Sequence, residues 1–297
     1  MKPESGKAGR TEAALDFEGQ LTYSGRVDLP ELTATNQHLT VLDARHRHGT
    51  VEEGAGGGGS AEDTLFRGCG FLLVKHTSAV VDWTDHEEVK AKYYNEAHEL
   101  VRRLLPSFTV NPSVGHIYRA EDVKENTTLE QGPALFVHND YGDDVDEDGS
   151  VVNRWCDLTH GNDSETSNRR MVGVNLWRSV SGKPLARMPL AVLDRRTVDH
   201  DALLYRKNPG LHAVGNMSTM PPDDDHKWHY YPQMTLDEVL VFLTYDSDPQ
   251  PNDLFGSEGA PFTPTMHTAV NIPDTDHLHQ RESVEMRYFA YSPLPGR

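Results

Sequence analysis

Cysteine, positive charge and long apolar runs are all scarce in this sequence. Only two cysteines occur, Cys69 and Cys156, which are too few for a disulfide framework. Lysines and arginines number 28 against 46 aspartates and glutamates, and the net charge of -18 would repel nucleic-acid phosphates and anionic membranes. No window approaches the roughly 18 consecutive apolar residues of a membrane-spanning helix. We therefore expect a cytoplasmic protein that binds neither nucleic acid nor a membrane.

The chain of 297 residues is long enough to bury a substantial core. Residues 1–20 are charged and lack the apolar core of a signal peptide, so we expect them to be disordered. Residues 21–297 show no internal repeat and no second domain boundary, and we expect them to form a single domain. The sequence contains no signal of an oligomeric state.

The order of the expected elements indicates a mainly β fold. One clear helix begins at a capping box of Thr84 and Glu87, carries an apolar stripe and ends before Pro106. From residue 114 onward the pattern changes to short strands separated by turns, at 114–119, 133–140, 171–178, 189–194, 227–231, 238–244, 263–270 and 281–291. Such strands with flanking helices are typical of a double-stranded β-helix, or jelly roll, with the helices packed outside.

A metal site is indicated by His138 and Asp140, which follow the apolar run 133–137. Residues two apart in an extended chain point to the same face, so this imidazole and this carboxylate would project together. With one further histidine they would make the two-histidine, one-carboxylate facial triad of non-haem Fe(II) oxygenases. A His-x-Asp alone is common, however, and a loop histidine beside an aspartate would explain it equally well.

Three later histidines are candidates for the third ligand. His226 and His229 belong to an aromatic strand, in which packing and a hydrogen bond would account for them. His267 instead precedes the strand that contains Arg281 and Ser283. An arginine fork with a hydroxyl two residues later suits the distal carboxylate of 2-oxoglutarate, whose keto-acid end would chelate the metal. We therefore predict His267 as the third ligand and Arg281 with Ser283 as the co-substrate residues.

Further pocket residues are expected on two strands. One strand places Asn175 and Trp177 on one face and Val174 and Leu176 on the other. If the first face lines the barrel, Asn175 would hydrogen-bond the co-substrate or the substrate, and Trp177 would form a wall of the substrate pocket. Packing between two sheets explains both residues equally well. Tyr118 is a further candidate for the substrate pocket.

The acidic segment after Asp140 begins like a calcium loop but lacks a required ligand. Residues 144–149 read Asp-Val-Asp-Glu-Asp-Gly. An EF-hand needs a bidentate glutamate at its twelfth position, where this chain has Trp155. We expect residues 141–150 to form a solvent-exposed loop that does not bind calcium specifically.

Several segments resemble the fungal hydroxylase/desaturase family, also described as gibberellin-desaturase-like. The segments that carry the resemblance are 70–76, 174–178, 189–194, 226–231 and 281–287, and the similarity extends over about residues 65–291. The resemblance implies the double-stranded β-helix fold and an oxygenase of secondary metabolism that depends on Fe(II) and 2-oxoglutarate. It also implies His138, Asp140 and His267 as iron ligands. The acidic insert after Asp140 departs from the family pattern.

Three functions remain open on this basis. The first is an oxygenase that uses Fe(II), 2-oxoglutarate and O2 to hydroxylate or desaturate a small molecule. The second is a metal-dependent hydrolase or isomerase, which would activate water but would have no use for Arg281 and Ser283. The third is a catalytically silent jelly-roll partner subunit, which would not need the metal ligands. The ordered set of ligands, arginine and serine favours the oxygenase, with substrate specificity expected in residues 141–170 and 200–225.

Overall fold

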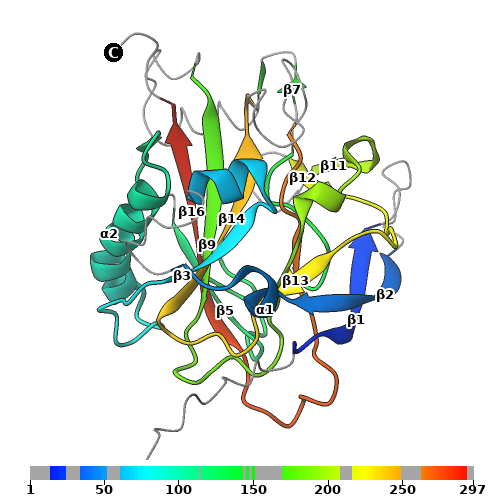
Figure 1. Cartoon of the computed structure of the whole chain (residues 1–297). Helices are drawn as coiled ribbons and strands as arrows, with labels where there is room; N and C mark the ends of the chain where they lie inside the picture. The colour runs from blue at the N-terminus through cyan, green and yellow to red at the C-terminus, as the bar shows by residue number, and fades with distance from the viewer. Residues whose placement is uncertain are drawn as a thin grey trace, which may run out of the picture.

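The computed structural model describes residues 14–24, 34–51, 61–113, 115–142, 145–146, 149–150, 169–207, 216–248 and 262–292. Two larger β-sheets face each other within these ranges (Figure 1). The seven-stranded sheet has the order β3-β14-β9-β16-β5-β6, with β4 also pairing β16. The five-stranded sheet has the order β1-β2-β13-β10-β15. Non-consecutive strands are therefore neighbours in both sheets, as the predicted jelly roll requires.

The elements have the following bounds. The seven-stranded sheet contains β3 (Phe71–Lys75), β4 (Thr109–Val110), β5 (His116–Ala120), β6 (Glu130–Gln131), β9 (Met171–Ser179), β14 (Glu238–Asp246) and β16 (Glu282–Tyr291). The five-stranded sheet contains β1 (Phe17–Ser24), β2 (Ala34–Asp43), β10 (Leu190–Leu193), β13 (Trp228–Tyr230) and β15 (His267–Ala269). Separate pairs are formed by β7 (Val145–Asp146) with β8 (Gly149–Ser150) and by β11 (Leu204–Lys207) with β12 (Asn216–Thr219). The helical elements are α1 (Ala44–His48), η1 (Asp63–Arg67), α2 (His86–Leu104), η2 (Arg195–Thr197) and η3 (His200–Ala202).

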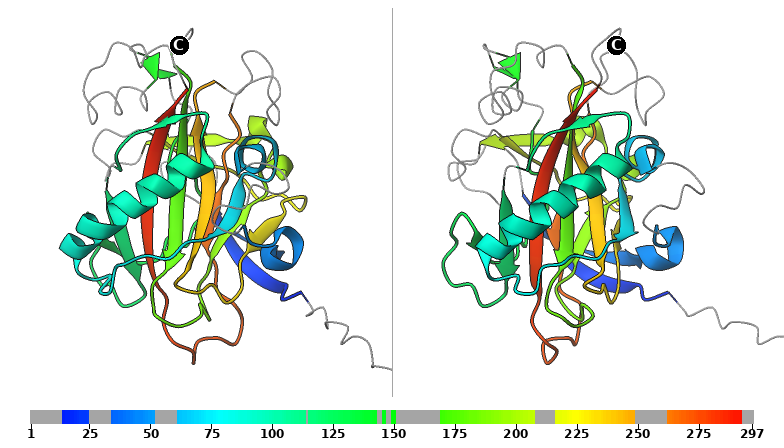
Figure 2. Two further views of the ribbon diagram at one scale, coloured as in Figure 1. Left: turned by 60° about the vertical axis from the view of Figure 1, so that its left-hand side comes forward. Right: turned by 90° about the vertical axis from the view of Figure 1, so that its left-hand side faces the viewer.

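Helix α2 covers the outer face of the seven-stranded sheet (Figure 2). Its cap differs from the prediction, because the side chain of Asp85, not Thr84, accepts hydrogen bonds from the backbone N–H groups of Glu87 and Glu88 at 3.0 and 3.2 Å. The Thr84 hydroxyl instead donates to Asp82. The predicted apolar stripe is confirmed, and its buried residues are Val89, Tyr93, Ala97, Leu100, Val101 and Leu104. They pack in one cluster with the outward-facing residues of β9, β14 and β16.

The opposite face of the seven-stranded sheet points toward the five-stranded sheet. Val174 and Leu176 belong to the cluster under α2, whereas Trp177 packs with Phe242 and Val192 in the cluster between the sheets. The predicted division of this strand into two faces is therefore confirmed. The interior between the sheets receives every second residue of β9, β14 and β16.

The N-terminal prediction is wrong for the residues that the structure describes. Residues 1–13 lie outside them, but Phe17–Ser24 forms β1 and pairs antiparallel with β2 in the register Leu21↔Gln37. Leu21 and Tyr23 are buried, and Glu18 and Gln20 are exposed. The period-two alternation was hidden in the sequence because the buried position 19 is a glycine without a side chain.

Two further expectations need correction at residues 133–142. This segment is not a regular strand, because its only bridges among described residues join His138 to His267 and Asn139 to Ser218. The start of the expected exposed loop is buried, since Tyr141 packs against Phe289 at a ring distance of 5.1 Å. Of the rest, 145–146 and 149–150 form β7 and β8, while residues 143–144, 147–148 and Trp155 lie outside the described residues. No helix of the described chain is long and apolar enough to cross a membrane.

Candidate metal centre

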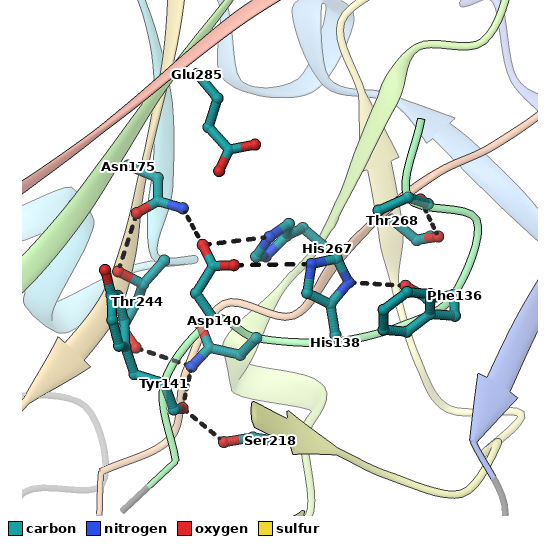
Figure 3. A network of polar contacts seen from close by, with 12 residues as sticks. Phe136, His138, Asp140, Tyr141, Asn175, Ser218, Thr244, His267, Thr268 and Glu285 are labelled. Carbon is teal, nitrogen blue, oxygen red and sulfur yellow. Dashed lines mark hydrogen bonds and ion pairs between the residues drawn. The ribbon is translucent and has the colours of Figure 1, made fainter. Parts of the chain in front are cut away.

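His138, Asp140 and His267 meet at the inner surface of the five-stranded sheet (Figure 3). One ligand atom from each lies within 4.8 Å of the others, and this is the single such group of three that the described residues contain. Nε2 of His138 is 3.9 Å from Oδ1 of Asp140, and Nε2 of His267 is 3.9 Å from Oδ2. The backbones of the two histidines pair directly, which brings a residue of the loop after β6 beside the start of β15.

Backbone carbonyls orient both imidazoles. Nδ1 of His138 lies 2.8 Å from the carbonyl oxygen of Phe136, and Nδ1 of His267 lies 3.3 Å from that of Thr265. Each Nδ1–H can therefore donate to a carbonyl, which leaves the Nε2 lone pair for a metal. Burial, reinforced by the neighbouring His267, lowers the pKa of His138 to about 3, and burial also lowers the pKa of His267. Both rings are thus neutral at pH 7, as ligation requires.

The carboxylate of Asp140 is held through both oxygens. Asn175 donates from Nδ2 to Oδ2 at 2.5 Å, and Arg287 donates from Nη2 to Oδ1 at 2.9 Å. Burial raises the pKa of Asp140, but the charge of Arg287 together with the two imidazoles and the Asn175 hydrogen bond lowers it below its usual range. Asp140 is therefore ionised. Asn175, which the sequence suggested for the co-substrate or substrate, instead contacts the carboxylate of the triad.

Arg281 is a buried cation in the same interior. It is 1% exposed, its guanidinium carbon lies 5.1 Å from the centre of the Trp177 ring, and its Nε donates to Oγ of Ser283 at 3.1 Å. Among the described residues no carboxylate forms an ion pair with its side chain, and Nη1 donates only to the Met188 carbonyl at 3.3 Å. Burial lowers its pKa to about 9. A buried charge of this kind is costly unless an anion joins it.

Three other candidates do not reach this centre. Tyr118 pairs with Val284 in the sheet register and packs in the cluster under α2, so its assignment to the substrate pocket is wrong. His226 stacks on Tyr23 at a ring distance of 5.8 Å. His229 faces the interior from β13, where its ring is 5.1 Å from that of His48. Neither histidine joins the group of ligand atoms around Asp140.

Two buried charged residues, Glu285 and Arg119, were missed by the sequence analysis. Glu285 lies between Arg119, whose Nε donates to it at 3.1 Å, and Arg287, whose Nη2 donates to it at 2.6 Å. A signal existed in residues 283–287, where polar and apolar residues alternate. On an antiparallel sheet that alternation ordinarily indicates a solvent-exposed polar face, whereas here the polar face lines the interior.

The facing sheets, the cluster of two histidines and one carboxylate, and the buried arginine together define a jelly-roll protein with a facial-triad type of metal site. The chain belongs to the family described as oxidoreductase/YMDC permease-like domain, which matches residues 29–291.

Characterised fungal proteins are similar over most of this chain. Hydroxylase/desaturase CTB9 of Cercospora beticola is 27% identical over 75% of this chain and 70% of its own. The gibberellin cluster GA4 desaturase of Gibberella fujikuroi is 25% identical over 75% of this chain and 82% of its own. Alpha-ketoglutarate-dependent dioxygenase phiK of a fungal species is 28% identical over 73% of this chain and 76% of its own. The resemblance identified in the sequence is confirmed.

A solved structure supports the fold. The iron and alpha-ketoglutarate-dependent endoperoxidase NvfI superposes with a TM-score of 0.71 at 19% identity, covering 93% of this chain and 98% of its own. The predicted jelly-roll fold is therefore confirmed.

Proposed function

We propose that this protein is an Fe(II)- and 2-oxoglutarate-dependent oxygenase that hydroxylates or desaturates a small-molecule intermediate of secondary metabolism. The observation that carries the proposal is Arg281, a buried guanidinium without a carboxylate partner among the described residues, in the interior that also holds the triad. A dicarboxylate co-substrate would supply that missing anion. Fe(II), 2-oxoglutarate and O2 together supply the oxidising power to break an unactivated C–H bond.

The residues present fit both cofactors. Two neutral imidazoles and one ionised carboxylate are the donor set that non-haem Fe(II) oxygenases use. His138 and His267 would bind the metal through Nε2, and Asp140 through its carboxylate. Arg281 would hold the distal carboxylate of 2-oxoglutarate, with the Ser283 hydroxyl donating a second hydrogen bond. Trp177, which packs against that guanidinium, would exclude water from the ion pair.

The relatives support this reading through the activities in their names. They include hydroxylases, desaturases and alpha-ketoglutarate-dependent dioxygenases, and these three align with 73–75% of this chain at 25–28% identity. A small molecule and O2 as reactants, and a cytoplasmic location, are parts of the same proposal. Residues 151–168 and 208–215, where we expected much of the substrate specificity, lie outside the described residues.

Both competing functions fit the site less well. A metal-dependent hydrolase or isomerase would use the triad but would leave the buried charge of Arg281 uncompensated. A catalytically silent subunit would need neither the imidazoles oriented by backbone carbonyls nor the doubly hydrogen-bonded Asp140. The proposed oxygenase uses all of these features.

Anaerobic spectroscopy tests the proposal directly. We expect Fe(II) and 2-oxoglutarate together, but neither alone, to give a weak visible charge-transfer band with the wild-type protein. Asp140→Asn should abolish the band, and succinate should form from 2-oxoglutarate once O2 is admitted to the wild type. A wild-type protein that binds Fe(II) but shows neither the band nor succinate would refute the proposed function.

A further inference from the structure

The inward face of β16 carries a charged network that reaches the metal centre. Arg287 pairs with Asn175 in the register between β16 and β9, and Glu285 pairs with Trp177. A single nitrogen of Arg287, Nη2, donates both to Oδ1 of Asp140 at 2.9 Å and to Oε1 of Glu285 at 2.6 Å. Arg287 is therefore shared between the metal-centre carboxylate and a second carboxylate on its own strand.

Glu285 is itself fixed from the opposite side. Its Oε2 accepts a hydrogen bond from Nε of Arg119 at 3.1 Å. Arg119 is anchored in turn, because Nη1 donates to the side chain of Gln131 and to the carbonyl of Gly132, each at 3.0 Å. The side chains of Arg119, Glu285 and Arg287 are at most 17% exposed. A continuous chain of charge-assisted hydrogen bonds thus runs from the β6 region to Asp140.

Glu285 supports the metal centre but is not placed to bind the metal. Figure 3 shows its carboxylate directed toward Asp140 and His267. However, both of its oxygens accept hydrogen bonds from arginines, and it is not part of the group of ligand atoms. A guanidinium on each side satisfies the carboxylate without a metal.

The network determines how Asp140 can act as a ligand. Asn175 occupies Oδ2 and Arg287 occupies Oδ1, so each oxygen already accepts one hydrogen bond. A carboxylate that bound the metal through both oxygens would fill one of the three positions that a facial triad leaves open. A bidentate co-substrate and O2 together need all three. Hydrogen bonds from outside the ligand set are known to orient ligands in this way.

We propose that Arg287 and Glu285 are positioning residues that restrict Asp140 to one-oxygen coordination and thereby keep the metal open to a bidentate keto acid. Arg287 restrains Oδ1, and Glu285 together with Arg119 holds Arg287 in place. This inference rests on the proposed function, because the open positions matter only if a chelating co-substrate binds.

The variant Glu285→Gln distinguishes a positioning role of Glu285 from a purely electrostatic effect on 2-oxoglutarate binding. Removing a buried anion would tighten the binding of dianionic 2-oxoglutarate if only Coulomb interactions mattered. The proposal predicts the opposite, weaker binding of 2-oxoglutarate, because Arg287 loses the carboxylate that holds it in place. We expect 2-oxoglutarate to bind Mn(II)-loaded Glu285→Gln about 10- to 100-fold more weakly than the Mn(II)-loaded wild type, by calorimetry. Mn(II) affinity without 2-oxoglutarate should change by less than about threefold in this variant, because the three ligands remain and Asn175 still donates its hydrogen bond to Asp140.

Two Arg287 variants and one control complete the test. Arg287→Met, which cannot donate, should weaken 2-oxoglutarate binding as much as Glu285→Gln does. Arg287→Lys can still donate to both carboxylates and should recover part of the affinity. Asp246→Asn removes a different buried carboxylate, which pairs with Arg170 at 2.5 Å, and should lower thermal stability without weakening 2-oxoglutarate binding.

Each result either supports or overturns the inference. It is overturned if Glu285→Gln binds 2-oxoglutarate as tightly as the wild type or more tightly. It is also overturned if Mn(II) and 2-oxoglutarate affinities fall in parallel, or if Asp246→Asn has the same effect. If Glu285→Gln does not fold, the comparison of Arg287→Lys with Arg287→Met decides. Failure of the Mn(II)-loaded wild type to bind 2-oxoglutarate would instead refute the proposed function.

Discussion

The guanidinium carbon of Arg281 lies 5.1 Å from the centre of the Trp177 ring, and its Nε donates to Ser283 at 3.1 Å. The ring shields the charge from water, and the hydroxyl fixes the orientation of the planar fork. The cation is therefore already in place before any anion binds. Such preorganisation lowers the entropic cost of binding a carboxylate.

Arg281→Ala should weaken 2-oxoglutarate binding far more than metal binding. Truncating one partner of a buried charge pair typically costs about 2–5 kcal/mol. Calorimetry with Mn(II), first alone and then with 2-oxoglutarate, measures both affinities. Arg178→Ala is a matched control, because Arg178 is also buried and lies 4.7 Å from the Tyr93 ring, but on the outer face under α2. That control should lose stability and keep its 2-oxoglutarate affinity. If Arg281→Ala bound 2-oxoglutarate as tightly as the wild type, the binding of the distal carboxylate would have to be assigned to Arg287 instead.

Local spacing was sufficient to predict that the candidate ligands lie close together. His138 and Asp140 are two residues apart, and their side chains do converge, although the segment is held by two bridges and not by a regular strand. His267 was separable from His226 and His229 because it precedes the strand of Arg281 and Ser283. The apolar stripe of α2 followed from helical periodicity alone.

The sequence analysis failed where the role of a residue depended on which face of the sheet its side chain points to. Tyr118 and Arg119 are adjacent, and only the pairing of β5 with β16 determines that the arginine points inward and the tyrosine outward. Glu285 was missed because a single sequence does not reveal that the polar face of its strand is enclosed by a second sheet. The contact of Asn175 with Asp140 likewise depends on packing between distant segments.

His267→Ala should lose bound metal, whereas His226→Ala and His229→Ala should retain it. His267 is one of the three grouped ligands, but His226 stacks on Tyr23 and His229 packs against His48. Iron content after anaerobic loading and succinate formation without substrate are the measurements. Retention of both by His267→Ala, with loss in either other variant, would show that the triad is assigned wrongly.

Asn175→Ala should weaken Mn(II) binding about 10- to 100-fold, because the amide donates to the Asp140 oxygen at 2.5 Å. Its other contact provides the control. The Thr244 hydroxyl lies 3.4 Å from Oδ1 of Asn175, so Thr244→Val removes one weak hydrogen bond and leaves the donor to Asp140 intact. We expect less than a threefold change, on the order of 0.5 kcal/mol, for that variant. Equal losses in the two variants would indicate a general packing defect.

Two buried histidines outside the metal centre should make the metal-free fold sensitive to acid. Burial, reinforced by a neighbouring histidine in each case, lowers the pKa of both His116 and His229 to about 4. In the unfolded chain each titrates near 6.5, so the unfolded state takes up protons first as the pH falls. Their contribution to stability is complete above pH 6.5 and is lost between about 6.5 and 4. The thermal midpoint of unfolding should therefore decrease as the pH is lowered from about 6.5 to about 4. The variant His229→Phe should show a smaller decrease.

Metal affinity should depend little on pH between about 6 and 8, because the ligands are already in their metal-binding forms. Burial lowers the pKa of His138 to about 3 and lowers that of His267. Burial alone would raise the pKa of Asp140, but Arg287, the two imidazoles and the Asn175 hydrogen bond together outweigh it and keep the carboxylate ionised. Two histidines with an ordinary pKa near 6.5 would instead lose roughly 15-fold in affinity over that range, because protons would compete with the metal. Mn(II) titrations at several pH values measure this dependence. A tenfold weakening from pH 8 to 6 would show that the imidazoles are protonated in the folded, metal-free protein.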